Sequence, residues 1–177
     1  MEDGYTLERT NERDADLFYT LVQNVWEGIE DKRIFSVQNM GQDWYERHLK
    51  EPSFGILARD KNGMVAGILI VVIPDEEEGN LGKDIGLPEK ELSKVVHMDT
   101  SAVLPEHRGH RLEQRMLVFA EECLKGTPFI YMLCTISPDN EASLISAKRI
   151  GYRVATTKEK YSGMIRHILF KKRIENT

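Results

Sequence analysis

The sequence has few cysteines, no long apolar run and no excess of positive charge. Cys123 and Cys134 lie in apolar surroundings without CxxC spacing, which favours two buried thiols in a reducing compartment over disulfides or a catalytic thiol. No apolar stretch approaches the ~20 residues that cross a bilayer. The acidic, polar N-terminal stretch is not typical of a signal or transit peptide. We therefore expect a cytoplasmic protein with no membrane partner.

The charge balance excludes a further class of partner. The 24 basic and 29 acidic residues give a formal net charge of −5, which argues against nucleic-acid binding. The one basic run, Lys171–Arg173, is expected to end a strand and not to bind a polyanion. With 177 residues, of which 41% are hydrophobic, the chain can bury a core without metal or disulfides. We expect one domain over residues 1–177.

Apolar residues at helical or alternating spacing predict a mixed succession of strands and helices. In chain order the elements are a strand, two helices, three strands, a helix, a strand, a helix and two strands. The clearest hairpin joins FGILARD to MVAGILIVVI through KNG, because Asn62-Gly63 favours the positive φ angles of a tight turn. This order predicts an α/β fold, a mixed sheet with helices on both faces.

Other segments carry weaker signals. The first helix is expected to follow Asn11, and the second, over residues 37–51, to be interrupted by Gly41. The polar segment 74–93 is expected to be a mobile surface excursion. Its acidic run, Asp75–Glu78, fits either a solvated loop or a surface for a polyamine or basic peptide acceptor.

The strand VVHMDTSAVL carries polar side chains among apolar ones. Strict alternation would place one set of residues on a single face: Val95, His97, Asp99, Ser101 and Val103. A carboxyl and an imidazole would then stand side by side.

The stretch SAVLPEHRGHRLEQRML begins with the last residues of this strand and leads into a predicted helix. A helix N-terminus attracts anions, Gly109 lets a ligand approach the backbone, and Arg108 and Arg111 add positive charge. A phosphate cradle and a solvated basic turn both fit these residues. No metal site is expected at His107 and His110, because the arginines between them would repel a cation.

The segment AVLPEHRGHRL resembles the acyl-CoA-binding signature V-x-P-x-x-R-G-x-G-x-G of the GNAT superfamily of N-acetyltransferases. The matching positions are Val103, Pro105, Arg108 and Gly109. A second similarity is Asn140 at the start of the next helix, followed by Gly151-Tyr152. The wider pattern SPDNEAS…GY…KYSGMIRHIL is similar to an uncharacterised bacterial branch of that superfamily.

The resemblance implies a GNAT-like, mostly antiparallel central sheet and acetyl-CoA as co-substrate. It implies direct attack on the thioester by a primary amine within a ternary complex. The amine is expected to belong to a small molecule, and a peptide is the less favoured alternative. A homodimer is compatible with it. The implied acetyl-CoA contacts are Ser101, Ala102, Val103, Arg108, Gly109, His110, Arg111, Leu112, Glu113, Asn140 and Ser143.

Three positions depart from the family pattern. Arg111 and Glu113 replace the second and third loop glycines, and Ala147 stands where many members carry a general-acid tyrosine. Arg111 keeps its backbone N–H and adds positive charge, whereas a carboxylate at Glu113 would repel pyrophosphate unless it turns to solvent. The small Ser143 and Ala147 share a helix face with Asn140 and would leave room for coenzyme A.

The acidic position of the strand suggests catalytic roles. Asp99 is the preferred general base and His97 the lesser candidate, although Asp99 would also fit a purely positioning role. Tyr161 is the candidate proton donor to the leaving thiolate, and lining the acceptor pocket is its alternative. Arg166 and His167 are expected on the sheet surface, or within reach of an anionic acceptor.

The departures keep a second function open. A GNAT-fold module that binds acyl-CoA without turnover, as a sensor or regulatory subunit, would tolerate Ala147 and the altered glycines.

Overall fold

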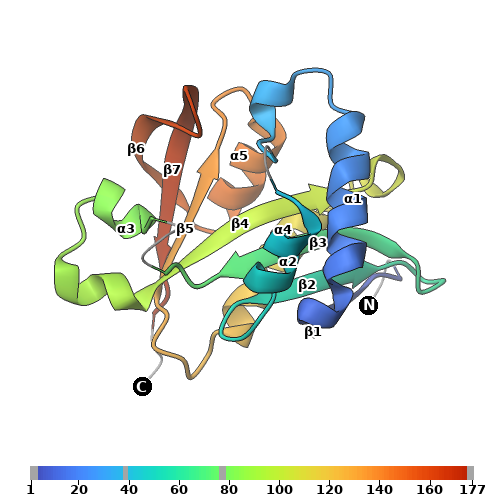
Figure 1. Cartoon of the computed structure of the whole chain (residues 1–177), viewed down its shortest axis with the longest axis horizontal. Coiled ribbons are helices and arrows are strands. Elements are labelled where there is room, and N and C mark those ends of the chain that lie inside the picture. The colour runs from blue at the N-terminus through green and yellow to red at the C-terminus, as the bar shows by residue number, and fades with distance from the viewer. Residues whose placement is uncertain (1–3, 38–39, 76–78, 175–177) are drawn as a thin grey trace.

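The computed structural model describes residues 4–37, 40–75 and 79–174. A single seven-stranded sheet, in the order β1-β2-β3-β4-β5-β7-β6, forms its centre (Figure 1). The strands are β1 (Thr6–Thr10), β2 (Phe54–Arg59), β3 (Val65–Val72), β4 (Val95–Val103), β5 (Tyr131–Ile136), β6 (Arg153–Lys160) and β7 (Met164–Lys172). The α-helices are α1 (Ala15–Glu27), α2 (Gln42–His48), α3 (Leu81–Asp84), α4 (Leu112–Cys123) and α5 (Glu141–Arg149).

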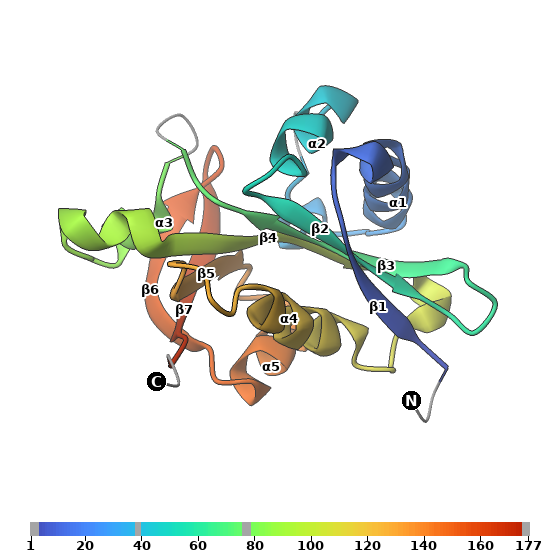
Figure 2. The same ribbon diagram turned by 90° about the horizontal axis from the view of Figure 1, so that it is seen from below.

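Helices cover both faces of the sheet, as the sequence predicts. In Figure 2, α1 and α2 lie on one face and α4 and α5 on the other. The apolar side of α1, which includes Phe18 and Val22, packs with Ile68 and Ile70 of β3. Met116 and Ala120 of α4 pack with the residues of β2 and β3 that point to the opposite face. The predicted order of elements is confirmed, with α3 as an addition.

The sheet is mostly antiparallel, also as expected, and its one parallel pairing is short. β4 and β5 are paired only where Val95–His97 faces Tyr131–Leu133. Beyond His97 the two strands separate, while β4 continues along β3 to Val103 and β5 continues along β7 to Ile136. The separation opens a gap in the middle of the sheet.

A bulge in β4 breaks the alternation predicted for this strand. The register between β3 and β4 shifts between Ile70 and Val71, so that Asp99 has no partner residue on β3. Before the bulge Val96 and Met98 face α4, and after it Val103 does so while Ala102 faces α1. The expectation that Val95, His97, Asp99, Ser101 and Val103 share one face is therefore wrong, because one extra residue inverts the pattern.

The turn that joins β2 and β3 confirms the predicted hairpin, with one difference in detail. Gly63 has a φ of 79°, whereas Asn62 keeps a negative φ. The Asp60 carboxylate accepts hydrogen bonds from the N–H groups of Asn62 (2.8 Å) and Met64 (2.9 Å). One glycine therefore suffices for the turn.

Two expectations for the helices need correction. Gly41 does not interrupt the second helix but precedes it, since α2 begins at Gln42. The segment expected to be a mobile excursion is folded over residues 79–93, where α3 and a 3-10 helix (Glu89–Lys94) bury Leu81 and Leu92. Of the acidic run, Glu76–Glu78 lies outside the described residues.

His97 ties this folded segment to the sheet. Its Nε2 accepts a hydrogen bond from the backbone N–H of Leu81 at 3.1 Å, and its side chain is buried. Burial, with the charge of Lys160 nearby, lowers the pKa of His97 to about 4. The ring is neutral and its Nε2 lone pair is occupied, which argues against His97, the lesser candidate, as the base.

The pKa of His97 makes folding depend on pH. An unfolded histidine titrates near ~6.5, so between pH 6.5 and 4 the unfolded chain binds the proton that the folded chain refuses. His97→Gln keeps an acceptor for Leu81 but cannot titrate. We expect the wild-type free energy of unfolding to fall by about 2 kcal/mol more than that of His97→Gln between pH 7 and pH 5. Urea unfolding at both pH values measures this; parallel losses would contradict it.

Candidate active site

Three connected cavities follow the gap between β4 and β5. The loop cavity, of ≈ 360 Å³, lies beside the turn before α4. The neck, of ≈ 80 Å³, lies between the separated strands. The main cleft, of ≈ 630 Å³, lies toward α3, β6 and β7. Ser101, Glu113, Asn140 and Ser143 line both the loop cavity and the neck. The neck therefore joins a cavity on the helix α4 side to a cleft on the β6–β7 side.

The loop cavity is built around the start of α4. Gly109 and Arg111 both have positive φ, 84° and 56°, and the left-handed Arg111 is the N-cap of α4 without a side-chain cap. A non-glycine residue pays a steric penalty in this conformation. A Cβ on Gly109 would meet no atom within 4 Å, so the space beside its backbone is open. The helix thus presents its first N–H groups to an open cavity.

All the predicted cofactor contacts except His110 line the loop cavity. The His110 ring packs on Tyr5, with a centroid distance of 5.1 Å, and His107 Nδ1 lies 3.0 Å from the Tyr5 hydroxyl. Both imidazoles therefore contact Tyr5, the residue directly before β1. Within the described ranges, no group of three or more His, Cys, Asp or Glu side chains is placed to hold a metal ion.

An anion site beside Glu113 was expected to require that its carboxylate turn to solvent. Instead, Glu113 is held inside the structure. Its Oε1 accepts a hydrogen bond from Ser143 Oγ at 2.8 Å, which links α4 to α5. Burial raises the pKa of Glu113, against the effect of its hydrogen bonds with Ser143 and Ser146. Asn140 caps α5 by accepting the N–H of Ser143 at 3.3 Å. These two predicted contacts, Asn140 and Ser143, thus also serve the helix pair.

Asp99 occupies the bulge and lines both the neck and the main cleft. The Thr100 hydroxyl donates a hydrogen bond to Asp99 Oδ2 at 2.8 Å. Desolvation by the surrounding protein raises the pKa of Asp99, while Thr100 and the charge of His48 oppose the rise. The bulge therefore places the Asp99 carboxyl, whose pKa is raised, at the point where the neck and the main cleft meet.

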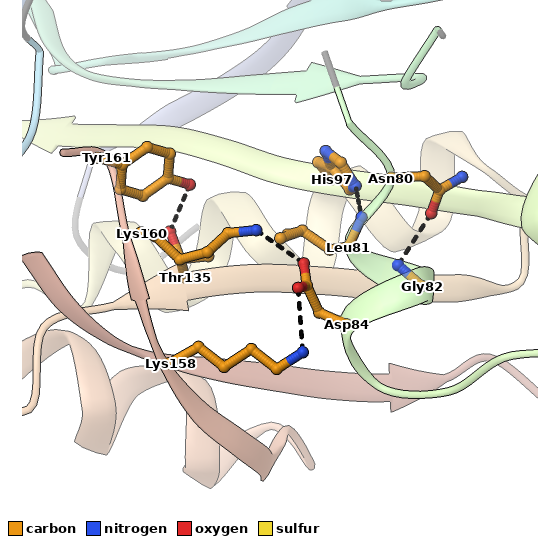
Figure 3. Close-up of polar contacts among 9 residues, drawn as sticks. All are labelled: Asn80, Leu81, Gly82, Asp84, His97, Thr135, Lys158, Lys160 and Tyr161. Atoms are coloured by element: carbon orange, nitrogen blue, oxygen red, sulfur yellow. Dashed lines mark hydrogen bonds and ion pairs between the residues drawn. The ribbon is translucent and has the colours of Figure 1, made fainter. Parts of the chain in front are cut away.

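Tyr161 reaches the same region from the turn between β6 and β7. Its φ of 49° begins a run of three left-handed residues that ends at Gly163. Its hydroxyl lies 3.0 Å from Thr135 Oγ1 on β5, as Figure 3 shows. Burial raises the pKa of Tyr161, so the phenol stays protonated at neutral pH. Tyr161 lines the main cleft, whereas Thr135 lines the cleft and the neck.

The neck also holds Cys134 and Ala147. Burial raises the pKa of the Cys134 thiol to about 12, so this thiol remains protonated, in line with its predicted role as a small buried side chain. Ala147 contributes no hydroxyl to the wall of the neck. Ser143 and Asn140 line the same cavity, which confirms their predicted shared helix face.

The β6–β7 side of the main cleft is basic. Arg166, expected on the sheet surface, is 3% exposed and lines the cleft. Lys160 lines the cleft too, and it shares the Asp84 carboxylate with Lys158 (Figure 3), at 2.8 and 3.2 Å. The surface position predicted for Arg166 is therefore wrong, and its alternative, reach to an acceptor, is the one that this geometry favours.

Ile34 and Phe35 line all three cavities, and the sequence gives no motif for them. Ile34 ends a short 3-10 helix, Lys32–Ile34, between α1 and α2, and Phe35 follows it directly. Their only signal is apolar character in a polar stretch.

Comparison with known proteins identifies the fold. No family model matches the chain, and no curated protein matches it. Solved structures do match. One is yncA from Salmonella typhimurium, which is described as an acetyltransferase and was solved with acetyl-CoA. It shares 15% identity with this chain at a TM-score of 0.72, over 98% of this chain and 96% of that chain. No helix among the described residues is long and apolar enough to cross a membrane.

Two further structures support the same fold. A GNAT-family acetyltransferase from Streptococcus pneumoniae has 14% identity and a TM-score of 0.69, over 96% of this chain and 99% of that chain. The ribosomal-protein-S18-alanine N-acetyltransferase of Escherichia coli has 14% identity and a TM-score of 0.66, over 94% of this chain and 91% of that chain. The chain described here has the fold of the GNAT acetyltransferases.

Proposed function

We propose that the protein is an acetyl-CoA-dependent N-acetyltransferase that acts on a primary amine of a small molecule. The observation that carries the proposal is the position of Asp99, at the junction between the neck and the main cleft. A base at that junction lies where a thioester in the neck and an amine in the cleft would meet. One of the structures of this fold was solved with acetyl-CoA.

The residues of the loop cavity fit coenzyme A. Open N–H groups at the start of α4, the exposed Arg108 and the open space beside Gly109 suit a pyrophosphate. From Thr100 to Val103, β4 pairs with β3 but has no pairing with β5 among the described residues. Its free edge at Ser101, Ala102 and Val103 offers backbone groups to an extended arm that enters the neck. Arg111 and Leu112 contribute their N–H groups.

When bound, acetyl-CoA supplies an activated acetyl group. The chain's own task is to prepare the amine, because an ammonium with a pKa near ~10.4 is not a nucleophile. Asp99 accepts the proton of the ammonium, directly or through water, and its raised pKa improves it as a base. Backbone N–H groups near Ser101–Val103 face the carbonyl oxygen on which negative charge develops.

The proton for the departing thiolate needs a donor other than residue 147, which is alanine. Tyr161 is the proposed donor. Its phenol stays protonated, and its hydrogen bond to Thr135 leads toward the neck. Tyr161 lines the acceptor side of Asp99, so it also shapes the acceptor cleft.

A second candidate function is a module that binds acyl-CoA without turnover. The observation in its favour is the neck itself, where Ala147 replaces a hydroxyl and the Glu113 carboxyl is committed to Ser143. Melting curves with acetyl-CoA, followed by thiol release with a panel of amines, separate the two. Stabilisation without release from any amine favours the module.

The cofactor site is tested by charge reversal. Arg108→Glu places a carboxylate beside the proposed pyrophosphate without touching the core, since Arg108 is exposed. We expect the Kd for coenzyme A to rise at least ten-fold, with an unchanged melting temperature of the free protein. Arg153→Glu, at the far end of β6 from Tyr161, is the matched control and should bind normally. Equal affinity of both variants would reject the loop cavity as the site.

The general base is tested by pH. Without Asp99, the amine must lose its proton to solvent, so Asp99→Asn should lower kcat/KM by about 100-fold or more at pH 7. The deficit should shrink as the pH rises toward the pKa of the amine. In the wild type, activity should fall on the acid side at a pH above the ordinary carboxyl range, because the pKa of Asp99 is raised.

The control for this test is Asp43→Asn, which makes the same change on the exposed side of α2. Its rate should match the wild type at each pH. A pH profile of Asp99→Asn that runs parallel to that of the wild type would remove Asp99 from the role of base.

A further inference from the structure

Arg166 is a buried cation with no acidic partner among the described residues. Its side chain lines the main cleft, yet it is 3% exposed. Its Nη1 donates to the carbonyl oxygen of Ile165 at 3.0 Å, and its Nη2 contacts the sulfur of Met164 at 3.2 Å. Across the part of the chain that the structure describes, no ion pair includes Arg166. A guanidinium removed from water without a counter-charge is costly.

The nearest charged neighbours on this wall do not neutralise it. Lys160 and Lys158 share one carboxylate, that of Asp84, so the trio keeps one positive charge in excess (Figure 3). Neighbouring His97 is neutral, because its pKa is lowered and its Nε2 accepts from Leu81. The β6–β7 wall of the cleft thus attracts an anion.

A carboxyl group of β4, that of Asp99, faces the same cleft. Asp99 lines it beside the neck, and no ion pair joins Asp99 to Arg166 within the described ranges. Two unlike charges therefore stand apart across one cavity of ≈ 630 Å³. Apolar and aromatic side chains, among them Trp44, Phe35 and Met40, form much of the remaining wall.

We propose that the acceptor is a small amino acid, an amine that also carries a carboxylate, held with its ammonium at Asp99 and its carboxylate on Arg166. This proposal rests on the N-acetyltransferase function proposed above and names its substrate class. A guanidinium binds a carboxylate through two N–H groups at once, which sets orientation as well as affinity. A zwitterion would pair with both Asp99 and the buried Arg166, whereas a simple alkylamine leaves Arg166 unpaired.

The reaction balances without further reactants. The amine loses a proton to Asp99, and its nitrogen forms a bond to the thioester carbonyl carbon as the C–S bond breaks. The nitrogen gives up a second proton as the amide forms, the thiolate takes up one proton, and Asp99 returns its proton to solvent. The products are an N-acetyl amino acid and coenzyme A. Arg166 takes no part in these bonds and is a positioning residue for the acceptor.

The test compares matched pairs of acceptors that differ only in the carboxylate. One set runs from glycine to 6-aminohexanoate, each against the n-alkylamine of the same chain length. A second set pairs the common α-amino acids with their methyl esters. Thiol release with acetyl-CoA gives kcat/KM for each compound. Calorimetric titration into protein saturated with coenzyme A gives binding without turnover.

For at least one spacing of amine and carboxylate, we expect the carboxylate to improve kcat/KM and binding at least ten-fold. In Arg166→Gln that ratio should fall to about one, while the Kd for coenzyme A stays unchanged. Arg166→Lys should restore part of the ratio. His167→Gln, on the other face of β7, is the matched control and should keep the wild-type ratio.

The outcomes separate the two proposals. Preferential binding of carboxylate-bearing amines without thiol release supports the substrate class and refutes turnover. Thiol release that is equal with and without the carboxylate supports turnover and overturns the substrate class. A carboxylate preference that persists in Arg166→Gln, or no response to any member of either set, also overturns it.

The melting temperature of Arg166→Met gives an independent readout. If Arg166 serves to bind the acceptor and not to stabilise the fold, replacing this buried cation with an apolar side chain of similar length should leave the melting temperature of the free protein unchanged or raise it. A drop of more than 5 °C would show that Arg166 holds the fold together, which contradicts the proposal.

Discussion

The site depends on one constraint, the parting of β4 from β5 after three paired residues. Each strand keeps its other neighbour, β3 or β7, so the sheet stays intact on both sides of the gap. The bulge in β4 coincides with the parting and turns Asp99 into it. Because backbone pairing ends here, an extended ligand can take the place of a neighbouring strand. The three cavities are consequences of that geometry.

Charge is distributed along the gap in an order that matches the proposed chemistry. Open N–H groups and Arg108 lie at one end, the Asp99 carboxyl at the centre, and Arg166 with Lys160 at the other end. Desolvation at the centre raises the pKa of the Asp99 carboxyl. At the far end, no ion pair among the described residues includes the buried guanidinium of Arg166. Both are costs to the free protein that bound substrates would offset.

Much of this was predictable from sequence, and the failures have physical causes. Hydrophobic periodicity gives the order of elements, and the motif around Arg108 and Gly109 gives the loop cavity. The bulge was not predictable, since an extra residue leaves no mark in an alternating pattern and reverses every later side chain. The burial of Arg166 was not predictable either, because it depends on how β7 packs with its neighbours β5 and β6, and β5 is distant from it in sequence. Segment 79–93 is held by contacts that are distant in sequence, among them the hydrogen bond of Leu81 to His97 and the ion pairs of Asp84 with Lys158 and Lys160.

The most direct test of the account is a crystal structure of the protein grown with acetyl-CoA. The account predicts pyrophosphate against the N–H groups that begin α4, the pantetheine arm along the free edge of β4, and the thioester in the neck next to Asp99. A loop cavity closed by the side chains of Arg111 or Glu113, or a thioester located away from the gap between β4 and β5, would contradict it.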